Sequence, residues 1–234
     1  MYSFSIKALA IAEQTSGLDA IKYLLDKNIV SSIGHTNATY DQAVEGIKAG
    51  ARSTTHLFNA MSPLAHRDPG AVGAVLDNAE IFAELILDGI HIHEAIFRIA
   101  LKSKGVDRIN LITDATSLAG LPDGEYGVLP DRAVTKIGGK IVLAGTDTLA
   151  GSALSMNMVY KNAAKFAPLT LSELSKISSL NAAKILRRDS EIGSLEVGKL
   201  ADLVLLDSEF TVCATMIEGE WKYVNSEWKE ALSS

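Results

Sequence analysis

Apolar residues in the first half of the chain follow two alternating patterns, one typical of buried strands and one typical of amphipathic helices. Runs of apolar or β-branched residues predict five strands, at 4–12, 29–35, 52–56, 81–89 and 109–115. Apolar residues at helical spacing predict four helices, at 17–27, 40–49, 71–77 and 93–105. Strands that alternate with helices from the first residues to Asp114 predict an α/β fold with a parallel sheet.

Local signals mark the ends of two of these helices. Thr39 and Gln42 have the spacing of a capping box, so a helix should begin near Tyr40, and Gly50 suits the position after its last turn. Gly105 should end the helix at 93–105.

The pattern changes after Asp114. Residues 121–129 and 133–145 predict an excursion of short strands joined by glycine turns, and two helices should follow at 152–167 and 171–186. The tail at 192–224 predicts a small β module appended to the α/β part.

Polar residues that bind metals end three of the predicted strands. His35 and His56 end successive strands, and Asp114 ends a later one. In a parallel β/α arrangement these strand ends lie at one edge of the sheet, where two imidazoles could share a metal ion. The alternative is that each histidine is an ordinary hydrogen-bonded polar residue.

Composition narrows the class of protein. The chain has 234 residues, a formal net charge of −6 and 47% hydrophobic residues, which is enough for a packed core. It has no apolar run of transmembrane length and no basic run, which argues against membrane or nucleic acid as a partner. One cysteine, Cys213, excludes an internal disulfide, and residues 1–14 suggest a strand rather than a signal peptide. We therefore expect a cytoplasmic protein.

Several short motifs resemble those of the amidohydrolase superfamily and, within it, the N-acetylglucosamine-6-phosphate deacetylases. The segments GHTNATYDQA, THLFNAM, HRDPG, LDGIH, TDA and DTLAGSALSM occur in that family's order and spacing. The ending NAAKIL and GSLEVGKLADLVLLD resembles the superfamily more generally, so the resemblance covers essentially the whole chain.

The resemblance implies a metal-dependent hydrolase in amino-sugar catabolism, which converts N-acetylglucosamine 6-phosphate to glucosamine 6-phosphate and acetate. It assigns His35 and His56 as ligands of one divalent metal, with zinc preferred and iron as an alternative, and Asp114 as the catalytic acid/base. The residues that it assigns to the sugar-phosphate substrate are Asn59, Ala60, Arg67, Asp88, Gly89, Ile90, His91, Leu149, Ala150, Gly151 and Ser152. It also allows Arg67 to act across a dimer interface.

Each assignment has a simpler alternative. Arg67 could form a surface ion pair with Asp68, His91 could cap the helix that begins near Glu94, and the small residues at 149–152 are a weak signal typical of many loops.

The family fold is a (β/α)₈ TIM-type barrel with a β-sandwich built from both chain termini. Here we count about five of the eight strands, so we expect a partial barrel over 1–190 and C-terminal sandwich strands over 191–234. The missing N-terminal part would carry the family's glutamate ligand and a histidine that polarises the substrate carbonyl. Glu13 is a possible substitute for that glutamate.

An open five-strand sheet leaves two unpaired edges and an uncovered face. We therefore expect a natural truncation, a split gene product or a piece of a longer protein that is at least dimeric in solution. Two further functions stay open: a catalytically impaired remnant that binds sugar phosphate, and a cyclic-amide hydrolase. The NAM and HRDPG motifs argue against the hydrolase, since cyclic-amide chemistry needs no phosphate grip.

Overall fold

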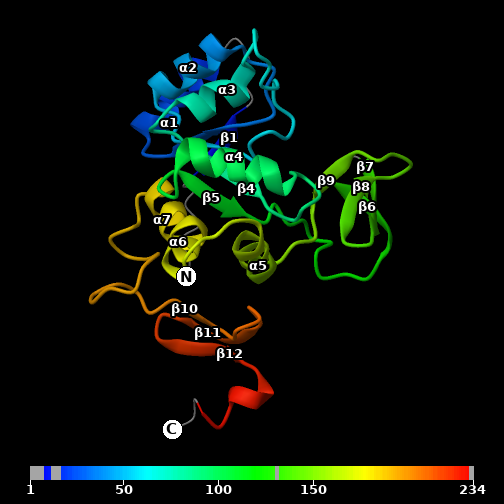
Figure 1. The fold of residues 1–234 in the computed structure, drawn as a ribbon, viewed down its shortest axis with the longest axis vertical. Coiled ribbons are helices and arrows are strands. Elements are labelled where there is room, and N and C mark those ends of the chain that lie inside the picture. The colour runs from blue at the N-terminus through cyan, green and yellow to red at the C-terminus, as the bar shows by residue number, and fades with distance from the viewer. Residues whose placement is uncertain (1–7, 12–16, 130–131, 232–234) are drawn as a thin grey trace.

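A parallel sheet of five strands, in the order β1-β2-β3-β4-β5, forms the centre of the computed structural model, which describes residues 8–11, 17–129 and 132–231 (Figure 1). The strands are β1 (Ala8–Ile11), β2 (Val30–Ile33), β3 (Ser53–Thr54), β4 (Phe82–Ile86) and β5 (Ile109–Ile112). All four pairings are parallel. The prediction of five parallel strands is confirmed, although the remainder of the first predicted strand lies outside the described residues.

Four helices connect these strands and pack against one face of the sheet. They are α1 (Gly17–Asp26), α2 (Tyr40–Ala49), α3 (Gly70–Asp77) and α4 (Glu94–Lys104). The capping box of Thr39 and Gln42 is formed in both directions, and Gly50 has the left-handed φ of 118° that a helix end of this kind requires. Val72, Phe97 and Leu85 lie in one buried core between helices and strands. The predicted helices are confirmed.

The excursion after β5 is an antiparallel sheet that projects from the side of the molecule (Figure 1). Its strands are β6 (Gly124–Leu129), β7 (Arg132–Ile137), β8 (Lys140–Leu143) and β9 (Leu149–Ser152). A bridge between Ala115 and Ser152 joins β9 to the chain just beyond β5. Residues 149–152 are therefore a strand, and the sequence-based view of them as a loop is wrong.

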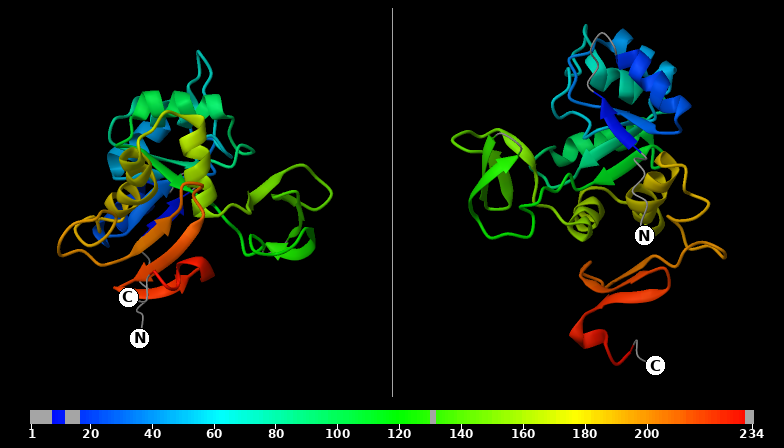
Figure 2. Two further views of the ribbon diagram at one scale, coloured as in Figure 1. Left: turned by 60° about the horizontal axis from the view of Figure 1, so that its bottom comes forward. Right: turned by 180° about the vertical axis from the view of Figure 1, so that it is seen from behind.

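The C-terminal part begins with helices and ends with a separate sheet. The helix predicted at 171–186 is interrupted by a π-helical segment. The elements are α5 (Met156–Phe166), α6 (Leu171–Ser175), η1 (Lys176–Leu180), α7 (Asn181–Ile185), β10 (Leu203–Leu206), β11 (Val212–Ile217), β12 (Glu220–Val224) and η2 (Ser226–Trp228). Strands β10–β12 form an antiparallel sheet beside the helices (Figure 2). Val204 and Tyr223 of this sheet are exposed. None of the helices in the described part is long and apolar enough to cross a bilayer.

Candidate active site at the carboxyl ends of the parallel strands

The three predicted strand-end residues share an unusual backbone conformation. His35, His56 and Asp114 have φ angles of 49°, 35° and 49°, which is the left-handed region that residues other than glycine seldom adopt. Each residue comes within two positions of the carboxyl end of β2, β3 or β5. Backbone strain of this kind is common at functional sites, so the shared conformation is consistent with a site at this edge of the sheet. The same conformation also occurs elsewhere in the described chain, at Asn28, Arg187, Phe210 and Glu218.

The two histidines face each other. Nε2 of His35 lies 2.8 Å from Nε2 of His56, and the ring planes meet at 75°. His56 is buried and His35 is exposed. Burial lowers the pKa of His56, the charge of His35 lowers it further, and the charge of Asp114 opposes both effects. The pKa shift favours the neutral imidazole, which is the form that binds metals.

This pair fits part of a metal site. Two nitrogens bound to one tetrahedral zinc lie about 3.4 Å apart, so the rings would need to separate by roughly half an ångström. Nδ1 of His56 is buried and has no hydrogen-bond partner among the described residues, whereas ligating histidines usually donate from that second nitrogen.

The described residues do not supply a complete set of ligands. Within residues 8–11, 17–129 and 132–231, no three His, Cys, Asp or Glu side chains converge closely enough to hold a metal ion. Catalytic zinc usually has three protein ligands, so the described chain offers two of them. Glu13, the candidate substitute for the missing glutamate ligand, belongs to the segment 12–16, which lies outside the described residues.

Strand β9 holds the residues around Asp114 in place. The backbone N–H of Ser152 donates to the carbonyl of Asp114 over 2.8 Å, and the N–H of Thr116 donates to the carbonyl of Ser152 over 3.0 Å. Gly151 has a φ of 75°, and a Cβ atom there would lie 2.6 Å from Cγ2 of Thr116. The small residues at 149–152 therefore permit close packing against the candidate acid/base.

The turn after β4 fixes the ring of His91. Oδ2 of Asp88 lies 2.7 Å from Nδ1 of His91, and Oδ1 accepts hydrogen bonds of 2.8 Å from the backbone N–H groups of Ile90 and His91. Burial raises the pKa of Asp88, but these hydrogen bonds outweigh burial and hold the pKa below its ordinary value. The alternative role of His91 as a helix cap is wrong, because His93 caps α4 by accepting from the N–H of Ala95.

The loop at 59–70 carries the predicted phosphate residues. The amide Nδ2 of Asn59 donates to the carbonyl of His56 over 3.3 Å, and Ala60 has a left-handed φ of 52°. Arg67 is exposed and forms no ion pair with Asp68 in the described chain, so that alternative is not supported. The structure thus brings Asn59 to the backbone of His56, whereas Arg67 is exposed on the same loop.

One polar group that was not among the predicted site residues lies on the face of the sheet opposite the helices. Glu84 lies in the middle of β4, and its carboxylate accepts a hydrogen bond of 2.7 Å from Ser53 on β3. The sequence does contain a signal for this residue, because Glu84 is the one acidic residue in the otherwise apolar run from 81 to 87.

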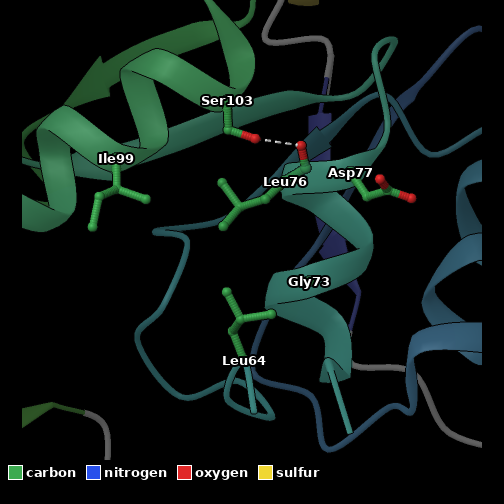
Figure 3. Close-up of a pocket in the computed structure, with 6 residues that line it drawn as sticks. All are labelled: Leu64, Gly73, Leu76, Asp77, Ile99 and Ser103. Carbon is green, nitrogen blue, oxygen red and sulfur yellow. Dashed lines mark hydrogen bonds between the residues drawn. The ribbon is translucent and has the colours of Figure 1, made fainter. Parts of the chain in front are cut away.

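A pocket on the helical side of the molecule lies apart from these residues (Figure 3). It lies between α3 and α4, where Oγ of Ser103 donates to the carbonyl of Leu76 over 2.7 Å. Its lining residues are Leu64, Gly73, Leu76, Asp77, Ile99 and Ser103. None of the predicted site residues is among them, so the pocket gives no support to a role in catalysis.

A parallel β/α sheet with polar residues at its carboxyl edge is typical of (β/α)-barrel enzymes. The chain belongs to the amidohydrolase family, whose model matches residues 8–222. It is 38% identical over 223 residues to an N-acetylglucosamine-6-phosphate deacetylase of Bacillus subtilis (strain 168), covering 95% of this chain and 56% of that protein. It is 36% identical over 217 residues to an N-acetylgalactosamine-6-phosphate deacetylase of Escherichia coli O157:H7, covering 92% and 57%.

Solved structures agree with this assignment. The D267A mutant of N-acetyl-D-glucosamine-6-phosphate deacetylase from Mycobacterium smegmatis, in complex with N-acetyl-D-glucosamine-6-phosphate, matches with a TM-score of 0.88 and 38% identity. The match covers 92% of this chain and 57% of that one. The chain spans about half the length of the curated relatives it matches.

Proposed function

We propose that this chain takes part in the metal-dependent hydrolysis of the acetamide of N-acetylglucosamine 6-phosphate, which gives glucosamine 6-phosphate and acetate in amino-sugar catabolism. The observation that carries the proposal is the pair of facing Nε2 atoms of His35 and His56, 2.8 Å apart, with Asp114 acting on His56. The names of the similar proteins support the substrate class.

We assign His35 and His56 as two ligands of one divalent ion, with zinc preferred and iron as the alternative. Neutral imidazole suits either metal. When bound, such an ion polarises an amide carbonyl and lowers the pKa of water, which is otherwise a poor nucleophile near pH 7.

Asp114 is the proposed general base and then general acid. Its carboxylate takes a proton from the attacking water and delivers it to the amine nitrogen as the C–N bond breaks, so that acetate and the amino sugar leave. Proton transfer by a positioned side chain contributes about 10²–10⁴ in rate. The hydrogen bond from the N–H of Ser152 on β9 to the carbonyl of Asp114 keeps the backbone of this residue in place.

The remaining predicted residues surround the substrate in this proposal. His91, with Nδ1 held by Asp88, has its other nitrogen left for the substrate, and the backbone of Gly89 and Ile90 continues that wall. The second wall is Leu149, Ala150, Gly151 and Ser152. Asn59, Ala60 and Arg67 take the phosphate, and an exposed guanidinium can bind it in a bidentate manner, in its own site or in that of a second copy.

A second candidate is a sugar-phosphate-binding protein that does not turn over its ligand. The observation that favours it is that the described residues hold only two candidate metal ligands. Under either candidate we propose a barrel part over 1–190, sandwich strands over 191–234, a homodimer or higher assembly, and a cytoplasmic location.

The test is acetate release from N-acetylglucosamine 6-phosphate by the purified chain with zinc or iron, with Asp114→Asn as the control. We expect release that falls about 10²–10⁴-fold in the variant. N-acetylhexosamine 6-phosphates that are epimeric at C2 test which sugar is preferred. The unphosphorylated sugar tests whether binding requires the phosphate. Zinc binding measured by calorimetry on the chain and on His56→Ala separates the candidates. Substrate binding without release, in the presence of bound zinc, would favour the second one.

A further inference from the structure

Strand β4 carries one ionisable side chain, that of Glu84, in its middle. Its neighbours Ala83, Leu85 and Leu87 lie in the core beneath the helices, and because side chains alternate along a strand, Glu84 lies on the opposite face. There its Oε1 accepts a hydrogen bond of 2.7 Å from Oγ of Ser53. No Lys or Arg of the described residues forms an ion pair with Glu84.

The register of the sheet places an acceptor without a donor beside this carboxyl group. Glu84 is paired with Asn110 of β5, so their side chains lie on the same face. Asn110 is buried, and its Oδ1 has no hydrogen-bond partner in the described chain. A buried acceptor left unpaired destabilises the folded state, and a donor from Glu84 would remove that cost.

We propose that the Glu84 carboxyl group carries a proton that it donates to Oδ1 of Asn110, and that this neutral bridge is a positioning element beneath the strand-end cluster. The bridge runs from Ser53 on β3 through Glu84 to Asn110 on β5. It therefore ties together the strands that lead to His56 and Asp114. Its role in positioning rests on the proposed function, whereas the protonation of Glu84 does not.

The electrostatic surroundings of Glu84 agree with a neutral acid. Burial raises the pKa of Glu84 to about 7, the hydrogen bond from Ser53 opposes this shift, and the charge of Asp114 adds to it. The other titratable groups at the ends of the neighbouring strands are His35, His56, Asp88 and His91. These groups are unchanged in the variants below, so their effects largely cancel when variants are compared.

The sign of the resulting pH dependence follows from the raised pKa. An unfolded glutamate titrates near 4.3, so the stability that the protonated group provides is fully present below that pH. It is lost as the pH rises through the folded value of about 7. Glu84→Gln is close in shape to the neutral acid and should lack this loss.

The experiment is urea unfolding of the wild type and Glu84→Gln between pH 5 and pH 8.5. We expect the unfolding equilibrium constant of the wild type to rise roughly 10²-fold relative to the variant over this range. Infrared difference spectra should show a carboxylic-acid band at pH 6 that is missing in Glu84→Gln. A constant ratio between the two proteins, with no such band, would overturn the proposal.

Two further variants test the partners. Asn110→Ala removes the acceptor of the proton and should lower the pH at which Glu84 titrates. Ser53→Ala removes a donor that favours the charged form and should raise it. An upward shift in Asn110→Ala would mean that the amide donates to Glu84, and the proposed bridge would be wrong.

The role in positioning has its own readout. If the chain releases acetate, Glu84→Gln should keep the wild-type rate at pH 6, whereas Glu84→Ala should lose at least tenfold. Equal rates in all three proteins would remove the positioning role. A chain without activity would count against the proposed function and leave the unfolding and infrared tests intact.

Discussion

The two faces of the parallel sheet differ in chemistry, although their residues alternate along the same strands. On the helical face, Ile33, Leu85 and Leu111 are buried in one apolar core with the helices. On the opposite face, polar side chains pair across strands: Oγ of Ser32 lies 2.9 Å from Oγ1 of Thr55, and Ser53 bonds to Glu84. One face is built mainly by packing, whereas the other combines directed hydrogen bonds with buried apolar side chains such as Phe82 and Ile86.

The two faces therefore serve different purposes, since the helical face mainly stabilises the fold and the opposite face lies next to the candidate catalytic residues. Apolar packing on the helical face is insensitive to pH and contributes in proportion to the area buried. The polar face depends on protonation and lies beneath the strand ends that carry His35, His56 and Asp114. Substitutions on the two faces should therefore have effects on stability that differ in size and in their dependence on pH.

The largest effect on stability should come from the helical face. Leu85 is fully buried, and Leu85→Ala should lower the free energy of unfolding by about 2–5 kcal/mol at every pH, because it leaves a cavity. Urea unfolding measures this effect. Leu171→Ala is the control, since Leu171 is 70% exposed and its truncation should change stability by about 0.5 kcal/mol or less. Equal effects would contradict the packing argument.

An intermediate effect is expected where β9 meets the strand ends. Gly151→Ala forces a side chain into a left-handed position and against Thr116, and should cost about 1–3 kcal/mol. Gly145→Ala is a matched control, because Gly145 has a φ of 76° but nothing within 4 Å of the added Cβ. Thermal unfolding should show a smaller loss for Gly145→Ala. If both variants lose the same stability, backbone strain alone accounts for the loss, and the close contact between residue 151 and Thr116 contributes nothing to it.

The smallest effect concerns a helix end on the apolar side. Thr39→Ala removes the capping box of α2 and should cost about 1 kcal/mol, with no change in acetate release or in the pH dependence of unfolding. Thr39→Ser keeps the hydroxyl and should restore most of the loss. If Thr39→Ala changed the pH dependence of unfolding, the proposed difference between the two faces would be contradicted.

Much of the fold was predictable because local rules decided it. The helix at 40–49 begins at its predicted capping box and ends at Gly50, the helix at 93–105 ends at Gly105, and the alternation of elements predicts the parallel sheet. The strand-end histidines were predictable for the same reason, since the ends of parallel strands meet at one edge. The role of residues 149–152 was not, because their packing against Asp114 depends on a bridge to a segment more than thirty residues away.

The sequence by itself determined the order of strands and helices, the helix caps and the candidate ligands, because hydrophobic period and capping act within a few residues. Only the tertiary structure decided that the two imidazoles meet at 2.8 Å, that Asp88 holds His91, and that Glu84 lies between Ser53 and Asn110. Each of these contacts joins side chains through strand register or a turn. The protonation of a buried carboxyl group depends on those neighbours and on desolvation, neither of which can be read from the residue alone.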